Sequence, residues 1–170
     1  MNTLNFINVV NKNNSDINHI CEYLALNIAK VCLNSKSGHL GASLSSLQLM
    51  TTLYFGGFLK FSLKNPRHPD RDRVLLRGHL GPLRYSLFSL LNWVEPEELL
   101  TYRFVNSRLQ GHECMFEIPG IDITPSGSLG MVLSYGIGSA IVSKQRKHVF
   151  KTWVFLGDGE EQEGNVSEAA

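Results

Sequence analysis

The 170-residue sequence predicts an α/β fold with a mainly parallel sheet, and two observations carry this prediction. Helical periodicities, loops and short β-rich runs alternate along the chain. Residues 149–156 are rich in β-branched and aromatic side chains and have the length of a buried strand. Gly-Asp-Gly follows this run, and residues 164–170 then have the pattern of a beginning helix. This order of strand, turn and helix is typical of a parallel sheet.

The first part of the chain predicts two helices. After an N-cap at Ser15 or Asp16, apolar residues recur at helical spacing. They are Ile17, Ile20, Cys21, Leu24, Ile28, Val31 and Cys32. Residues 35–41 interrupt the pattern, and a second apolar helix is expected at about residues 43–58.

The middle of the chain predicts one strand and three further helices. Residues 73–77 have the composition of a short strand, and residues 83–91 that of a helix. The next helix starts at residues 95–98, where a proline stands early and acidic side chains lie at the positive end of the helix dipole. Residues 104–125 are rich in loop residues, and residues 127–143 predict a helix of small and apolar residues.

Bulk composition limits the classes of function. The hydrophobic fraction of 43% supports a packed core, and the net charge of +1 gives no electrostatic argument for nucleic acid or an anionic membrane. Residues 1–14 are expected to be a tail, and residues 15–170 one partial domain. Cys21, Cys32 and Cys114 form no Cys-x-x-Cys pair, and an odd number of cysteines without a signal-peptide pattern favours reduced thiols and a cytoplasmic location.

The Gly-Asp-Gly turn is a candidate metal and diphosphate site. Asp158 follows the expected strand at its carboxyl end, where open α/β sheets bind ligands. Its carboxylate suits Mg²⁺ or Ca²⁺, which prefer oxygen ligands. Gly157 and Gly159 can adopt backbone angles closed to other residues and let a ligand approach the main chain. The alternative is a tight turn, because Asp-Gly is a strong turn dipeptide.

Three of the six histidines follow a glycine, namely His39, His79 and His112. Their separations exclude a metal-binding pair one turn apart on one helix, but the fold could still bring them together. Imidazoles in such a cluster could hydrogen-bond sugar hydroxyls and exchange protons near neutral pH. For each histidine alone, a structural hydrogen bond or simple exposure is the alternative, whereas the repeated setting favours a shared pocket.

A glycine-containing segment, Gly127-Ser128-Leu129-Gly130, is expected to open a helix. The free backbone N–H groups and the positive dipole end of such a helix could bind an anion or hold a cofactor ring. The alternative is an ordinary helix start with Ser126 or Ser128 as its cap.

Taken together and in order, five motifs resemble the amino-terminal part of transketolase, the thiamine diphosphate enzyme. They lie at residues 37–45, 70–79, 107–112, 127–130 and 157–164. The similarity covers about residues 17–170 and fits transketolase better than the related deoxyxylulose-phosphate synthase or pyruvate dehydrogenase. It implies a parallel-sheet thiamine diphosphate-binding fold that is incomplete at its C-terminus.

The resemblance also implies a reaction, a two-carbon ketol transfer between a ketose phosphate and an aldose phosphate in the pentose phosphate pathway. Asp158 would bind the Mg²⁺ (or Ca²⁺) that holds the cofactor diphosphate, and Glu163 would join a carboxylate network near the subunit interface. The implied cofactor-binding residues are Gly127, Ser128, Leu129, Gly157, Asp158 and Gly159. The implied catalytic residues are His39, His79, His112 and Glu163.

Departures from the family pattern leave two hypotheses open. The family's pyrimidine-binding and carboxy-terminal domains have no counterpart here, and Met131-Val132 stands where the family commonly has Gln-Gly. The first hypothesis is the amino-terminal portion or a split subunit of a transketolase, inactive without a complementary C-terminal subunit or segment. It predicts a homodimer or heterotetramer. The second is a non-catalytic remnant or interaction subunit that retains the fold. A nucleotide-binding domain is disfavoured, because neither Gly-x-Gly-x-x-Gly nor a P-loop is present.

Overall fold

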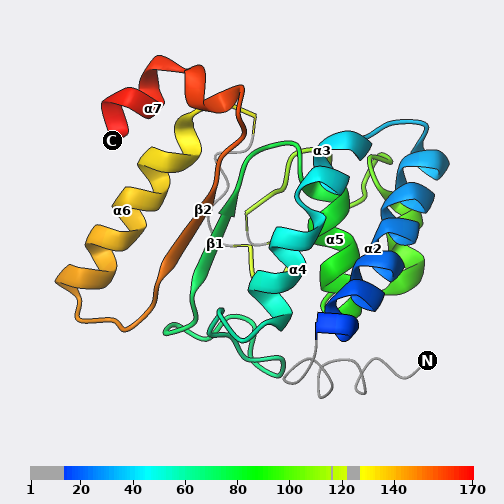
Figure 1. The fold of residues 1–170 in the computed structure, drawn as a ribbon, viewed down its shortest axis with the longest axis horizontal. Coiled ribbons are helices and arrows are strands. Elements are labelled where there is room, and N and C mark those ends of the chain that lie inside the picture. Colours follow the sequence, from blue (N-terminus) through cyan, green and yellow to red (C-terminus); the bar gives the residue numbers. More distant parts are fainter. Residues whose placement is uncertain (1–13, 116, 122–126) are drawn as a thin grey trace. The chain divides into compact units, whose positions relative to one another are not determined.

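A computed structural model of the protein describes residues 14–115, 117–121 and 127–170. The chain divides into two compact units. Unit 1 comprises Met1–Leu59 and His79–Gly111, and unit 2 comprises Lys60–Gly78 and His112–Ala170. The elements in chain order are α2 (Asn14–Ser35), α3 (Leu40–Ser45), α4 (Leu47–Phe55), β1 (Arg73–Leu76), α5 (Gly81–Leu90), η1 (Pro96–Thr101), α6 (Met131–Gln145), β2 (Thr152–Phe155), η2 (Glu160–Gln162) and α7 (Gly164–Ala169) (Figure 1).

Unit 1 is a helical cluster with its own apolar core. The apolar stripe expected on α2 is confirmed, because Ile20, Leu24 and Ile28 are fully buried. Helix α2 contacts α4 and α5, and the 3₁₀ helix η1 packs against α2 and α5. The ring of Phe88 on α5 lies 4.8 Å from that of Trp93, in an edge-to-face arrangement that aromatic pairs favour. Burial of these side chains supplies the main stabilisation of the unit.

Unit 2 contains a short parallel sheet covered by a helix. Strands β1 and β2 pair in parallel, with Arg73 opposite Thr152 and Leu76 opposite Phe155. Helix α6 lies along one face of this pair (Figure 1). The approach is close at Gly136, where a Cβ would collide with the side chain of Val154. The expected parallel sheet is therefore confirmed, and within the described part of the chain it has two strands.

A buried carboxylate fixes the start of both strands. Asp72 is 4% exposed and precedes β1. Its two oxygens accept hydrogen bonds from the backbone N–H of Lys151 at 2.8 Å and of Lys60 at 3.1 Å. The indole N–H of Trp153 donates to the same carboxylate at 3.2 Å. Because buried donors without partners are costly, Asp72 holds three segments of unit 2 in register.

Two of the predicted helices differ from the structure. The single helix expected at residues 43–58 is wrong, because the chain forms α3 and α4 with a break at Ser46. The hydroxyl of Ser45 donates to the carbonyl of Ala42, which competes with regular helical bonding just before the break. The helix expected from residue 127 begins only at Met131, since Gly130 adopts a left-handed φ of 80°.

Smaller differences concern length and helix type. The strand expected at residues 149–156 is limited to β2, and the helix expected to start at residues 95–98 is the 3₁₀ helix η1. In the described residues no helix combines the length and hydrophobicity that crossing a bilayer requires.

Candidate active site

The Gly-Asp-Gly turn connects β2 to η2 in unit 2. Asp158 is exposed, so its carboxylate can meet a ligand. Gly157 is buried, and a Cβ at this position would collide with the guanidinium of Arg77. Gly159 has an ordinary φ of −68°, with open space around it. Neither glycine has a positive φ, so the expected unusual backbone angles are wrong, whereas close approach of a ligand stays a prediction.

Glu160 joins this turn to the loop that precedes α6. Its side chain is 6% exposed. One carboxylate oxygen accepts the backbone N–H of Gly130 at 2.9 Å, and the other accepts the N–H of Gly157 at 3.2 Å. Sequence alone does not single out Glu160, because nothing in the run Glu-Glu-Gln-Glu distinguishes it from Glu161 or Glu163.

The loop before α6 has a backbone that favours glycine. Gly127 and Gly130 have φ values of 111° and 80°. At Gly130 a Cβ would collide with the side-chain amide of Asn165 on α7, and this amide donates to the carbonyl of Leu129 at 3.0 Å. The backbone N–H of Gly130 donates to the carboxylate of Glu160. The expectation of free backbone N–H groups at this helix start is therefore wrong for Gly130.

The expected serine caps of this helix have different outcomes. No side chain caps the start of α6, so Ser128 does not act as its cap. Ser126 lies outside the described residues. Ser128 itself is exposed, and its role in cofactor binding stays a prediction.

Two of the predicted histidines meet in unit 1. The ring centroids of His39 and His79 lie 4.7 Å apart, with the rings at 67° to each other. His39 stands directly before α3, and His79 stands before α5. Both residues are half-buried, and the Nδ1 atom of His39 is buried. The structure therefore brings together two side chains that are 40 residues apart, His39 and His79.

Arg103 contacts two motif segments of unit 1, at Ser37 and at Gly111. Its guanidinium donates to the hydroxyl of Ser37 and packs directly against Gly111. It also lies 5.7 Å from the ring centre of Tyr102. Burial raises the pKa of the Tyr102 hydroxyl and of the Cys32 thiol, while the nearby Arg103 charge opposes both shifts. Arg103 is not predicted from the sequence, because no motif contains it.

His112 and Glu163 are exposed residues of unit 2. The ring of His112 lies against Gly78, because a Cβ built on Gly78 would be 2.9 Å from the Nδ1 atom of His112. A Cβ built on Gly127 would be about 4.0 Å from the same ring. Glu163 stands at the start of α7. A common pocket for the three histidines, and the carboxylate network of Glu163, stay predictions.

The donor set fits a metal ion that takes most of its ligands from a diphosphate and water. Among the described residues, no group of three or more His, Cys, Asp or Glu side chains could hold a metal ion. Mg²⁺ commonly uses one or two carboxylates and completes its shell with phosphate oxygens and water. The exposed Asp158 offers one carboxylate of this kind, and its role as a metal ligand stays a prediction.

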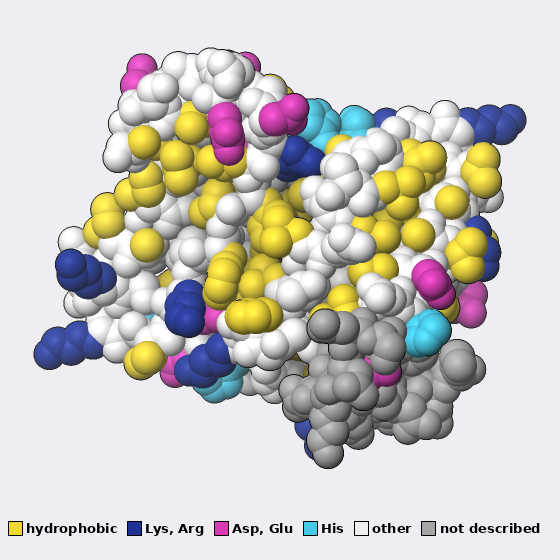
Figure 2. Space-filling view, viewed as in Figure 1, with side chains coloured by type: hydrophobic (Ala, Val, Ile, Leu, Met, Phe, Trp, Pro, Cys, Tyr) yellow, Lys and Arg dark blue, Asp and Glu magenta, His cyan; other side chains and the backbone are white. Residues whose placement is uncertain are grey.

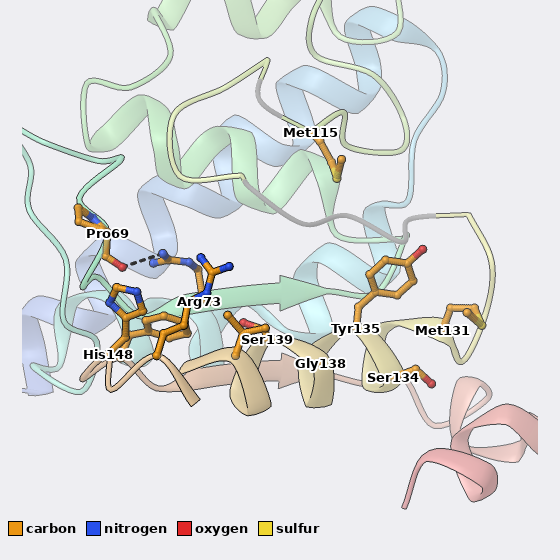
Figure 3. A pocket seen from close by; sticks show the side chains of 12 residues that line it. Pro69, Arg73, Met115, Met131, Ser134, Tyr135, Gly138, Ser139 and His148 are labelled. Atoms are coloured by element: carbon orange, nitrogen blue, oxygen red, sulfur yellow. Dashed lines mark hydrogen bonds between the residues drawn. The ribbon is translucent and has the colours of Figure 1, made fainter. Parts of the chain in front are cut away.

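A separate groove of about 910 Å³ lies along α6 (Figure 3). At one end the Arg73 guanidinium lies 4.4 Å above the Phe150 ring, and its side chain donates to the carbonyl of Pro69. Beside them a hydrogen bond with His148 lowers the pKa of Asp70. None of the described lining residues is a predicted site residue, so we assign no catalytic role to this groove.

Residues 15–170 match the protein family described as transketolase, thiamine diphosphate binding domain. The chain belongs to this transketolase family. The match includes the loop before α6 and the Gly-Asp-Gly turn, the two segments that Glu160 connects.

Individual transketolases agree with this assignment. One subunit of the apulose-4-phosphate transketolase of Phocaeicola vulgatus is 35% identical over 144 residues, covering 84% of this chain and 50% of that protein. The 6-deoxy-6-sulfo-D-fructose transketolase subunit SqwG of a Clostridium species is 38% identical over 135 residues, covering 78% of this chain and 48% of that protein. The chain therefore spans about half the length of these two relatives.

Solved structures support the fold as well. The transketolase of Campylobacter jejuni superposes with a TM-score of 0.83 at 28% identity, covering 93% of this chain and 26% of that chain. The expected α/β fold of a transketolase thiamine diphosphate-binding domain is thus confirmed.

Proposed function

We propose that this chain is the amino-terminal, cofactor-binding part of a transketolase, as a split subunit or as a segment of a longer protein. The assembled enzyme transfers a two-carbon ketol unit between a ketose phosphate and an aldose phosphate. The observation that carries this proposal is the meeting of two family segments, the loop of Gly130 and the turn of Gly157, on the carboxylate of Glu160. The two relatives named as transketolase subunits support a split arrangement.

The residues of unit 2 bind the cofactor and its metal ion. Asp158 provides one carboxylate oxygen to Mg²⁺ (or Ca²⁺), and diphosphate oxygens and water complete the shell. Arg77, which packs against Gly157, adds positive charge where the diphosphate binds. The loop residues Gly127, Ser128 and Leu129 line the rings of thiamine diphosphate.

The histidines bind the sugar and move protons. Thiamine diphosphate supplies the carbanion chemistry of the reaction when it is bound. The imidazole nitrogens of His39 and His79 donate hydrogen bonds to the hydroxyl groups of the transferred unit, and His112 is assigned the same task. An imidazole can give or accept a proton near neutral pH, which suits a transfer that forms and breaks carbonyl groups.

A complementary C-terminal transketolase subunit or segment completes the site, in a homodimer or heterotetramer. Figure 2 shows apolar side chains gathered over α6, and Tyr135, Ile141 and Val142 are between 44% and 50% exposed. Exposed apolar patches of this kind often mark protein interfaces. The three free cysteines support a cytoplasmic location.

Reconstitution of ketol transfer tests the proposal. The chain is combined with its complementary subunit, Mg²⁺ and thiamine diphosphate, and transfer from a ketose phosphate to an aldose phosphate is followed. We expect turnover by the wild type and a loss of about a hundredfold in kcat for His79→Ala, since general acid–base groups contribute at least this much. The matched control is His148→Ala, an exposed histidine outside the predicted site, and it should retain wild-type turnover.

Two other results would contradict the proposal. A correctly folded assembly that binds thiamine diphosphate without any turnover would indicate the non-catalytic subunit instead. Equal turnover by the wild type and His79→Ala would remove the histidine from the mechanism.

A further inference from the structure

We propose that Glu160 is a positioning residue, whose carboxylate sets the spacing between the two loops that bind thiamine diphosphate. This inference rests on the proposed function, because it assigns a task to the same site. Glu160 itself does not contact the cofactor; it acts through the backbone of Gly130 and Gly157.

Glu160 is buried and engages a different loop with each oxygen. Its side chain is 6% exposed, while its chain neighbours Glu161 and Gly159 are exposed. The two N–H groups that it accepts come from Gly130 and Gly157, at 2.9 and 3.2 Å. Hydrogen bonds to a charged acceptor are about twice as strong as those between neutral groups. One side chain thus links a segment 30 residues earlier in the chain to the end of β2.

The two linked loops have different tasks in the proposed site. The segment that ends at Gly130 lines the rings of the cofactor, and the turn that begins at Gly157 carries the metal-binding Asp158. Rings and diphosphate belong to one molecule, so the two loops must keep a fixed separation for it to bind to both. A site held in its binding geometry before the ligand arrives binds more tightly, because less ordering remains to be done on binding.

A second contact restrains one of these loops from α7. The amide of Asn165 donates to the carbonyl of Leu129 and packs against Gly130. Asn165 therefore restrains the first loop, whereas the carboxylate of Glu160 hydrogen-bonds to both loops. A buried carboxylate is costly unless it is hydrogen-bonded, so an apolar residue could fill the same space but could not link the loops.

Two substitutions separate this role from simple packing. Glu160→Gln keeps the size of the side chain but places an amide NH₂ against one N–H donor, which breaks one of the two links. Glu160→Asp keeps the charge but is one methylene shorter, so it cannot span both loops. Glu161→Gln, on the exposed next residue of η2, is the matched control.

The test uses the full chain assembled with Mg²⁺ and its complementary subunit. Calorimetry gives the dissociation constant of thiamine diphosphate, and kinetics give its KM and the kcat at saturating cofactor. We expect Glu160→Gln to weaken cofactor binding by about tenfold to a hundredfold, the effect of losing one hydrogen bond to a charged group. The KM for the cofactor should rise in parallel while kcat at saturation stays near the wild-type value. Glu160→Asp should also weaken binding, and Glu161→Gln should match the wild type.

A second readout needs no cofactor. Amide hydrogen exchange should be faster in Glu160→Gln than in the wild type at Gly130 or Gly157, whichever N–H faces the new NH₂ group, because the carboxylate protects that N–H in the wild type. Val154→Ala, a packing change at the contact of the half-buried β2 with α6, serves as a control for general destabilisation.

Three outcomes are distinguishable. In the first, the wild type binds thiamine diphosphate normally, and Glu160→Gln has the same cofactor affinity and the same amide exchange. This result would overturn the inference but not the proposed function. In the second, Glu160→Gln loses no more cofactor affinity than Val154→Ala, and the two variants have the same melting temperature. Glu160 would then have only a structural role, which would also overturn the inference. A wild-type assembly that binds no thiamine diphosphate would overturn the proposed function itself.

Discussion

Helix α5 of unit 1 and helix α6 of unit 2 both consist mostly of apolar and small residues, but they are buried to very different extents. Every residue of α5 is buried. In α6 the buried residues are Val132, Gly136, Ser139 and Ser143, while Tyr135, Ile141 and Val142 are substantially exposed. Strand β2 of unit 2 shows the same trend, because every one of its residues is only half-buried, whereas Val74, Leu75 and Leu76 of β1 are buried.

The difference indicates that the two units hold their functional residues in different ways. In unit 1 an apolar core fixes the positions of α3 and α5, and thereby of His39 and His79. In unit 2, hydrogen bonds to two buried carboxylates contribute more to holding the segments in position. These carboxylates belong to Asp72 at the start of the strands and Glu160 at their end. The exposed apolar surface of α6 would gain stability by burial against another surface.

The largest expected effect comes from removing a side chain of the unit 1 core. Phe88→Ala should lower the free energy of unfolding by about 4 kcal/mol, because a fully buried ring is lost and a cavity remains. The control in unit 2 is Ile141→Ala on α6, where half of the side chain is exposed, and it should cost less than about 0.5 kcal/mol. Urea unfolding of both variants measures the contrast, and equal losses would contradict it.

A smaller effect is expected for the polar link of unit 2. Asp72→Ala leaves the N–H groups of Lys60, Lys151 and Trp153 without this acceptor. The variant should lose about 3 kcal/mol, within the range for buried donors deprived of a partner. Thermal unfolding measures the loss, with the exposed Asp70→Asn as its matched control. If Asp72→Ala melts like the control, polar links do not hold the strands of unit 2.

The smallest effect concerns an ion pair of unit 1. The Arg108 guanidinium hydrogen-bonds Glu98 at 2.6 and 2.8 Å and lowers the pKa of that carboxyl below its usual value of 4.5. Because the folded-state pKa is depressed, the stabilisation is present above pH 4.5 and is lost as the pH falls through the lower folded value. Glu98→Gln should therefore be less stable than the wild type by about 1 kcal/mol at neutral pH.

The pH dependence of this ion pair gives the check. The difference in unfolding free energy between the wild type and Glu98→Gln should shrink when the pH is taken well below 4.5. A difference that is independent of pH would show that the carboxylate charge does not stabilise unit 1.

Local patterns predicted the elements of this fold, and tertiary contacts decided their ends. The stripe through Ile20, Leu24 and Ile28 follows from helical periodicity, and the parallel strand pair follows from its β-rich runs. The start of α6 could not be predicted in the same way. It depends on the left-handed Gly130, whose N–H is bound by a side chain 30 residues away.

In the candidate site, too, some residues could be predicted from local motifs, whereas others depend on tertiary contacts. Motifs identified Asp158 and the histidine pair, because their residue types and positions at element ends carry a chemical meaning. The supporting residues Glu160, Arg103 and Asn165 were missed. Each of them acts on a segment at least 30 residues away in sequence, through a geometry that residue type alone does not specify.

The central claim is that unit 2 binds thiamine diphosphate through a metal ion held by Asp158. Calorimetric titration of thiamine diphosphate into the assembled protein, with and without Mg²⁺, tests it most directly. The wild type should bind only with the metal ion, and Asp158→Ala should weaken binding by at least about tenfold to a hundredfold, since even residues around a metal's direct ligands have effects of this size. The matched control is Glu161→Ala in the same exposed stretch, and it should bind like the wild type. Equal affinities of the wild type and Asp158→Ala, or binding that does not depend on Mg²⁺, would contradict the claim.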